Sequence, residues 1–275
     1  MSLRLIKKLE GKSDRKRFEI LIEEVRARNW AYSLQEYHHR KLYGCNLIID
    51  LFTGRPTTIL LVAHYDSFAG SPGANDDASA LAVLIDAGER IANLNPSKNI
   101  RMIFFDDEEP TIHWFRPLGS TKYVEEFGLD GLHAVIDLEM CGIGDAVGIW
   151  PVKDMEDRPM LLQISEMLSR MQIHYDYGYQ VPGFYADYEP FRAAGFLDSY
   201  CLTVFDWVER DLVRAFSESS HAELAARFVG WKTLKRPLVP RLFQHYHTSA
   251  DRSEFVSEDA LAMMSDVVVE LVKEL

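Results

Sequence analysis

The fold is decided by the stretch LLVAHYDS at residues 60–67, in which an apolar run ends on His64 and Asp66. A turn-rich loop, GSPGAN at residues 70–75, leads from there to Asp76 and to a helical pattern. Histidine and carboxylate side chains at the ends of strands are how α/β enzymes hold divalent metals. The stretch therefore predicts an α/β fold and the first part of a metal site.

Apolar runs that alternate with helical patterns continue along the chain. We predict strands at 46–51, 58–63, 100–105, 134–140 and 202–205, and helices at 14–28, 77–94, 120–127, 160–170 and 258–275. Such alternation gives a sheet whose strands are mostly parallel and whose two faces are covered by helices. The predicted fold class is therefore α/β, with three layers (α/β/α) around a mixed, mostly parallel central sheet.

The sequence contains no internal repeat and no linker that would separate two domains. Residues 1–275 are therefore predicted to form one domain, since no stretch rich in Gly, Pro or Ser divides them. Charged and aromatic residues are mixed over about 206–241, and we expect this segment to be a helical excursion or a lid.

The chain is acidic, with 30 basic and 42 acidic residues and a formal net charge of −12. This charge argues against a nucleic acid or an anionic membrane as the partner. No apolar run approaches the ~18–20 residues that a membrane helix needs. The three cysteines are widely spaced, which favours reduced thiols over a disulfide framework. These features predict a cytoplasmic protein and leave the oligomeric state open.

Further metal-binding residue types follow apolar runs or lie in later loops. They are Glu108 and Glu109, Glu139, and His247. Because the carboxyl ends of parallel strands line one edge of a sheet, we expect these side chains to meet His64 and Asp76 there. Two histidines with several carboxylates suit zinc. Two zinc ions that share a bridging carboxylate need about five ligands and lie about 3.5–4 Å apart.

Six motifs, in this order along the chain, resemble those of a known family. They are HYD at 64–66, GANDD at 73–77, FFDDEE at 104–109, EMCG at 139–142, ADYEPF at 186–191 and HTSAD at 247–251. With these motifs the chain resembles the di-zinc aminopeptidase (exopeptidase) family, which also contains the animal-type glutaminyl cyclases and transferrin-receptor-like proteins. The resemblance covers about residues 58–251 and implies the phosphorylase/hydrolase-like zinc exopeptidase fold.

The resemblance also implies roles for the residues of the motifs. Two zinc ions are expected, bridged by Asp76, with a peptide as the substrate. Glu108 would be the general base that takes a proton from the attacking water. Asp66 would accept a hydrogen bond from a ligand histidine and so orient its ring. The remaining ligands implied are His64 and Glu139 on one ion, and Glu109 and His247 on the other.

The strand predicted at 134–140 offers two candidates for its metal ligand. Asp137 and Glu139 alternate onto the same face of the strand, so either carboxylate could reach a metal. Glu139 is preferred because it lies nearer the strand end and three residues before Gly142, as the acid of the family does.

The favoured activity is that of an aminopeptidase, the zinc-dependent removal of an N-terminal residue from peptides. The alternative is a glutaminyl-peptide cyclotransferase, in which a single zinc on Asp76, Glu109 and His247 would polarise the γ-amide of an N-terminal glutamine. The segment EEPTIHW at 108–114 resembles the cyclases, whereas the short spacing from His64 to Asp76 resembles the aminopeptidases. A third and less favoured interpretation is a non-catalytic protein on the same scaffold.

Three residues are expected to contact the substrate. A free α-amine needs an acidic anchor, which Asp187 could supply, and Trp114 indicates an apolar pocket. Tyr246 precedes a ligand histidine and could donate a hydrogen bond to a developing oxyanion.

Overall fold

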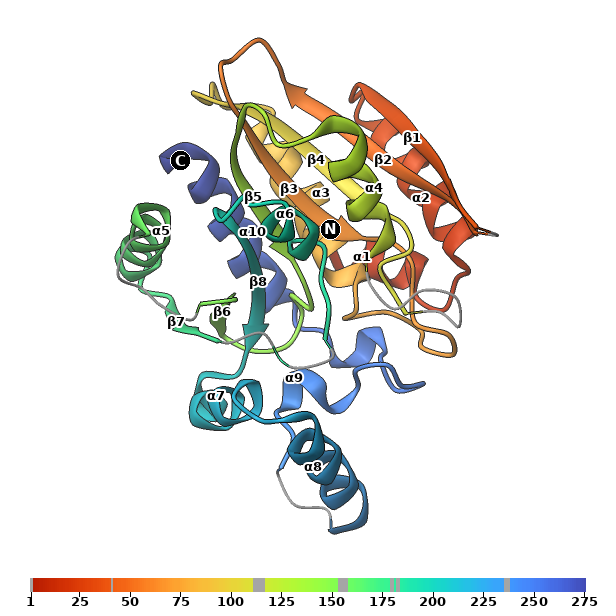
Figure 1. The fold of residues 1–275 in the computed structure, drawn as a ribbon, viewed down its shortest axis with the longest axis vertical. Helices are drawn as coiled ribbons and strands as arrows, with labels where there is room; N and C mark the ends of the chain where they lie inside the picture. Colours follow the sequence, from red (N-terminus) through yellow and green to blue (C-terminus); the bar gives the residue numbers. More distant parts are fainter. Residues whose placement is uncertain are drawn as a thin grey trace.

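A single eight-stranded sheet organises the molecule (Figure 1). The computed structural model describes residues 2–40, 42–110, 117–152, 158–178, 181, 184–234 and 238–275. The strand order across the sheet is β1-β2-β4-β3-β5-β8-β6-β7. The strands are β1 (Tyr32–His39), β2 (Leu42–Phe52), β3 (Thr58–His64), β4 (Asn99–Phe105), β5 (Leu132–Leu138), β6 (Ala146–Trp150), β7 (His174–Tyr177) and β8 (Ser199–Phe205).

The centre of the sheet is parallel and its flanks are mixed. β3 pairs in parallel with both β4 and β5, and β5 pairs in parallel with β8. β2 runs antiparallel to β1 and to β4, and β6 runs antiparallel to β8 and parallel to β7. The predicted mixed, mostly parallel sheet is confirmed. The carboxyl ends of β4, β3, β5 and β8 consequently lie side by side along one edge.

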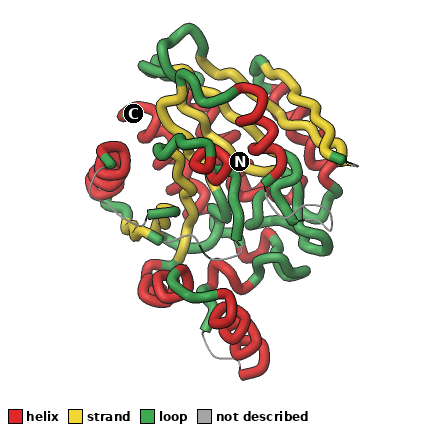
Figure 2. Tube along the Cα trace, viewed as in Figure 1, coloured by secondary structure: helices red, strands yellow, loops and turns green. Residues whose placement is uncertain are grey.

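Helices cover both faces of this sheet, which confirms the predicted three layers (Figures 1 and 2). One face carries α1, α2, α3, α5 and α10, and the other carries α4 and α6. The helices are α1 (Ser2–Leu9), α2 (Asp14–Ala27), α3 (Ala78–Ile91), α4 (Leu118–Phe127), α5 (Pro159–Arg170), α6 (Glu189–Ala193), α7 (Arg210–Ser217), α8 (His221–Leu234), α9 (Arg241–Gln244) and α10 (Glu258–Glu274).

Strand β3 shows why the central strands are apolar on both faces. Ile59, Leu61 and Ala63 pack into the core under α3 and α10, whereas Leu60 and Val62 pack under α4 and α6. All five side chains are at most 1% exposed, so each fully buried leucine or valine contributes about 1.5–3 kcal/mol of hydrophobic free energy. Burial of both faces fixes the register of β3, and with it the position of its carboxyl end.

The segment predicted as a helical excursion contains α7 and α8, followed by α9. These helices lie beyond the carboxyl end of β8, at the foot of the molecule in Figure 1. Over the described residues, no helix combines the length and the apolar character that crossing a membrane requires.

Candidate metal centre

The residues at or just after the carboxyl ends of three neighbouring strands lie at one edge of the sheet. β3 ends at His64, β4 ends just before the loop that carries Glu108 and Glu109, and β5 ends just before Glu139. The predicted strand at 134–140 is two residues shorter at this end than expected. Met140 takes a left-handed backbone with φ of 50°, which ends the strand and turns the chain at the site.

Two groups of ligand atoms share Asp76. In the first, Nε2 of His64 lies 3.2 Å from Oδ1 of Asp76 and 3.6 Å from Oε2 of Glu139. In the second, Nε2 of His247 lies 3.6 Å from Oδ2 of Asp76 and 2.8 Å from Oε2 of Glu109. Within each group, one ligand atom per residue lies within 4.8 Å of the others. The two oxygens of Asp76 therefore face two separate candidate metal positions.

Glu108 lies beside these two groups. Its Oε2 is 3.9 Å from Nε2 of His64, and its side chain lines the neighbouring cavity. The structure thus brings the five predicted ligands and the predicted base together.

Asp66 joins the strand β3 to the loop after β4. Its Oδ1 is 3.3 Å from Nδ1 of His64 and accepts the backbone N–H of Glu108 at 3.2 Å. Its Oδ2 accepts the backbone N–H of Glu109 at 2.9 Å. One carboxylate therefore orients the ring of His64 and fixes the main chain of both glutamates.

The loop that carries Asp76 is held from the far end of the chain. Oδ1 and Oδ2 of Asp251 accept the backbone N–H groups of Asn75 and Asp76 at 2.8 and 3.1 Å. Asp77 occupies the N-cap position of α3, but its side chain makes no capping bond. Oδ1 of Asp77 instead accepts the N–H of Met140 at 3.1 Å. Asp77 therefore ties the Asp76 loop to the end of β5.

Three residues other than glycine adopt left-handed backbone conformations around the site. They are Asp107, Met140 and His247, with φ of 54°, 50° and 55°. Such conformations cost about 1–3 kcal/mol each unless the surroundings impose them, and they gather at functional sites. Each of the three belongs to, or directly adjoins, a segment that carries a candidate ligand.

The site concentrates buried carboxyl groups. Burial raises the pKa of Glu108 well above its ordinary value, against the opposing charge of His64. Burial and the charge of Asp76 raise the pKa of Glu109 to about 7. Burial would also raise the pKa of Asp76, but the hydrogen bond and charge of His64 outweigh it and lower that pKa. A cluster of carboxylates this buried is stabilised by cations at the same place.

We expect the metal-free protein to lose stability between pH 5 and pH 8. Glu109, Asp251 and Asp106 each have a pKa of about 7 in the fold, raised first by burial. A carboxyl with a raised folded pKa stabilises the fold below its unfolded pKa of about 4, and this stability disappears as the pH rises through the folded pKa. With a chelator present to remove metal, the Tm at pH 8 should be about 5 °C or more below the Tm at pH 5. A Tm that is equal or higher at pH 8 would contradict the raised pKa values.

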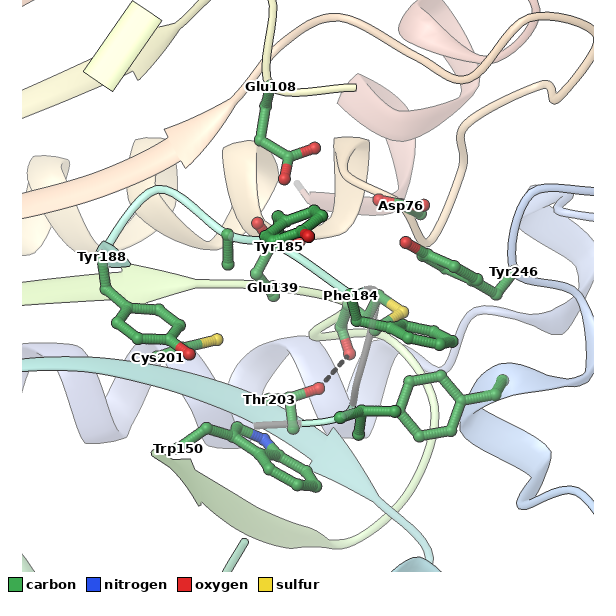
Figure 3. Close-up of a pocket in the computed structure, with 14 residues that line it drawn as sticks. Asp76, Glu108, Glu139, Trp150, Phe184, Tyr185, Tyr188, Cys201, Thr203 and Tyr246 are labelled. Carbon is green, nitrogen blue, oxygen red and sulfur yellow. Dashed lines mark hydrogen bonds between the residues drawn. The ribbon is translucent and has the colours of Figure 1, made fainter. Parts of the chain in front are cut away.

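A cavity opens directly beside the candidate ligands (Figure 3). Asp76 and Glu108 lie at one side of it and Trp150 at the opposite side, with Tyr185 and Tyr246 between them. The rest of its wall is mostly apolar, formed by Glu139, Met140, Val181, Phe184, Ala186, Tyr188, Cys201, Thr203 and Phe243. A pocket with acids at one side and aromatic walls suits a ligand with one cationic and one apolar part.

The predicted substrate-binding residues fall in three different places. Tyr246 lines the cavity and stacks on His247 with ring centroids 3.7 Å apart. Asp187 is fully buried and is not among the residues that line the cavity. Burial raises its pKa well above the ordinary value. Trp114 lies outside the described residues.

The choice between Asp137 in β5 and Glu139 just after it is reflected in their contacts. Oδ2 of Asp137 accepts the backbone N–H of Tyr188 at 2.9 Å, and this side chain is fully buried. Glu139 lies in the group with His64 and Asp76, and its Oε1 has no hydrogen-bond partner among the described residues. The geometry favours Glu139 as the candidate ligand.

Several residues of the site carry no signal in the sequence pattern. Trp150 closes the cavity from a strand that was not predicted, and Phe68 stacks on His247 with ring centroids 4.0 Å apart. Asp251 is part of the HTSAD motif, yet its two hydrogen bonds to the Asp76 loop follow only from the fold.

A model of a known protein family matches most of the sequence of this chain. The model of Peptidase family M28 matches residues 46–272. The chain belongs to peptidase family M28. This confirms the family predicted from the six motifs and makes the protein a member of a family of peptidases.

Relatives of this M28 chain include enzymes of two kinds. Aminopeptidase YwaD of Bacillus subtilis is 26% identical over 223 residues, which make up 80% of this chain and 41% of YwaD. The solved zinc aminopeptidase BSAP, also from Bacillus subtilis, has a TM-score of 0.60 at 23% identity, covering 83% of this chain and 49% of that one. The glutaminyl cyclase of Porphyromonas gingivalis has a TM-score of 0.74 at 16% identity, covering 99% and 96%.

These likenesses confirm the fold, while this M28 chain spans less than half the length of YwaD and of BSAP. The donor set fits zinc, because imidazole nitrogens of the buried His64 and the half-buried His247 converge with buried carboxylate oxygens on two positions that share Asp76.

Proposed function

We propose that this M28 protein is a zinc aminopeptidase that hydrolyses the N-terminal residue from peptides and uses two zinc ions. The observation that carries the proposal is the position of Asp76, whose two oxygens face the His64–Glu139 group and the His247–Glu109 group. A bridging carboxylate between two three-ligand groups is the arrangement of two-metal hydrolases.

In this proposal each ligand has one place. His64 and Glu139 would hold one zinc, Glu109 and His247 would hold the other, and Asp76 would be the ligand shared by both. Zinc in such a site polarises the scissile carbonyl and lowers the pKa of water. Asp66 keeps the tautomer of His64 fixed by its contact with Nδ1, at 3.3 Å.

Glu108 is the proposed general base. Its buried carboxylate lines the cavity, and its backbone N–H is anchored on Asp66, so the side chain is held at the reacting centre. Glu108 takes a proton from the attacking water and delivers it to the leaving amine. Tyr246, on the cavity wall, donates its hydroxyl hydrogen to the oxyanion that develops on the carbonyl.

The cavity explains how a peptide N-terminus would be held. The free α-amine is cationic and belongs at the acidic side, near Glu108 and Glu139. The first side chain then points toward Trp150, Tyr188 and the other apolar wall residues. Asp187, which is fully buried, serves in this proposal as an acid behind the cavity wall and not as a direct contact to the amine.

A second candidate is a glutaminyl-peptide cyclotransferase. It is favoured by the likeness in fold, since the glutaminyl cyclase of Porphyromonas gingivalis matches 99% of this chain with a TM-score of 0.74. In that case a single zinc would be held by Asp76, Glu109 and His247. The α-amine of an N-terminal glutamine attacks its own γ-amide, and Glu108 passes the proton of the amine to the amide nitrogen, which leaves as ammonia. A non-catalytic role is disfavoured, because the complete ligand set and Glu108 lie together.

Zinc content and a paired assay distinguish these candidates. We expect about two zinc ions per chain by elemental analysis, as a carboxylate-bridged centre requires, and release of free N-terminal amino acids from peptides. The same preparation is then given a peptide that begins with glutamine, and its conversion to pyroglutamate is followed by mass spectrometry. One zinc per chain with pyroglutamate formation and no amino-acid release would overturn the aminopeptidase proposal in favour of the cyclase.

A further inference from the structure

Arg17 of α2 is fully buried beneath the candidate metal centre. Its side chain is 0% exposed and is among the largest fully buried side chains of the described residues. An arginine is almost never buried this completely without a partner that compensates its charge. The residues around its guanidinium therefore indicate what it does.

The guanidinium of Arg17 is bonded to the loop that carries Asp76. Nη2 donates to the carbonyl oxygen of Gly73 at 3.2 Å. Gly73 has φ of 66°, and a Cβ atom on it would lie 2.3 Å from Nη1 of Arg17. Only glycine allows this approach, so Arg17 and the GANDD motif fit together.

Four carboxylates act on this cation through their charges and form no ion pair with it, and Nε and Nη1 of Arg17 have no hydrogen-bond partner among the described residues. Burial lowers the pKa of Arg17, and the charges of Asp66, Asp14, Asp77 and Asp76 oppose that effect. Asp66 and Asp76 belong to the candidate centre, and Asp77 ties the same loop to β5. Arg17 therefore supplies positive charge to a site that is otherwise crowded with acids.

Other residues near the start of the chain hold the same loop and the segment after His247. The N–H of Gly11 donates to Pro72 at 2.8 Å, and the N–H of Ser67 donates to Oδ1 of Asp14 at 3.2 Å. The N–H of Ser253 donates to Oε2 of Glu10 at 3.4 Å. Residues 10–17, which supply these hydrogen bonds, lie before residue 46, where the family match begins. The contacts therefore involve a part of the chain that the family match does not include.

We propose that Arg17 is a positioning residue for the metal centre, which holds Gly73 and thereby Asp76, and whose charge offsets the carboxylates while no metal is bound. The inference rests on the proposed zinc site. Of the four acids that act on Arg17, only Asp76 is a proposed zinc ligand, but the charge of bound zinc would offset Asp76 directly and act on Asp66 and Asp77 beside it. The charge of Arg17 therefore matters more to the metal-free protein than to the loaded one. A purely structural arginine would stabilise both forms equally.

Three variants test this in the full chain. Arg17→Met keeps the length of the side chain and removes the charge, whereas Arg17→Lys keeps the charge and loses the planar fork. Arg15→Met is the matched control, because Arg15 lies on the same helix with a side chain that is 90% exposed. For each protein we would measure the Tm in a chelator and in excess zinc, the zinc content, and kcat and KM on a peptide.

We expect Arg17→Met to lower the Tm, relative to the wild type under the same condition, by about 5 °C more in the presence of a chelator than in excess zinc. Arg17→Lys should keep the wild-type difference between the two Tm values, with kcat lowered about tenfold and KM little changed, because Asp76 is displaced. Arg15→Met should resemble the wild type in every measurement.

Equal losses of Tm in chelator and in zinc for Arg17→Met would overturn the inference. If Arg17→Met cannot be isolated in either form, Arg17→Lys decides, since a wild-type kcat in that variant rules out positioning. A wild-type protein whose Tm does not respond to zinc would instead contradict the proposed metal centre itself.

Discussion

Glu108→Gln is expected to lower kcat by about 10²–10⁴-fold and to leave zinc bound. Glutamine has the same shape as glutamate but cannot accept a proton from water, so only the proposed base function is removed. The backbone N–H of Glu108 still donates to Asp66 at 3.2 Å, which keeps the loop in place. The five proposed ligands remain unchanged.

The measurement is kcat on a peptide substrate together with zinc content by elemental analysis. Glu125→Gln is a suitable control, because this glutamate on α4 has a side chain that is 57% exposed and lies away from the cavity lining. A Glu108→Gln enzyme with the wild-type rate would refute the assigned role. Loss of zinc together with loss of rate would show that Glu108 is a ligand and not only a base.

Asp76→Asn is expected to remove both zinc ions and all measurable activity. Its two oxygens face two ligand groups, so loss of its charge weakens both positions at once. His64→Gln, by contrast, changes one group only and should leave about one zinc per chain. The zinc content of the two variants therefore separates a shared ligand from an unshared one.

Asp77→Asn is the matched control for this experiment. Asp77 is the neighbouring buried carboxylate, and an asparagine oxygen can still accept the N–H of Met140. We expect this variant to keep both ions. An Asp76→Asn protein that still binds two zinc ions would contradict the bridging role, whatever its activity.

The central part of the fold and the candidate site were predictable from the sequence. The apolar runs of β3, β4 and β5 are buried on both faces and therefore read as strands without ambiguity. The ligand-type residues follow these runs directly, and parallel strands place their carboxyl ends at one edge. For this reason the convergence of His64, Glu109 and Glu139 is predictable from the strands, whereas Asp76 and His247 lie in loops and are assigned to the same site by their motifs.

The edges of the sheet were not predictable in the same way. β1 is an edge strand whose sequence, YSLQEYHH, is largely polar because one side of it faces solvent. β7 has four residues, too few for a periodic pattern. The buried position of Arg17 also carries no local signal, since an arginine on a helix is usually exposed.

The candidate ligands are spread along the chain from residue 64 to residue 247, although they meet at one edge of the sheet. No short piece of the polypeptide contains a complete set. During synthesis, the first ligands emerge from the ribosome long before His247, so the nascent chain cannot assemble the shared site of Asp76. If the protein binds the proposed pair of zinc ions, their acquisition is therefore a late event, which only a nearly finished and correctly paired sheet permits.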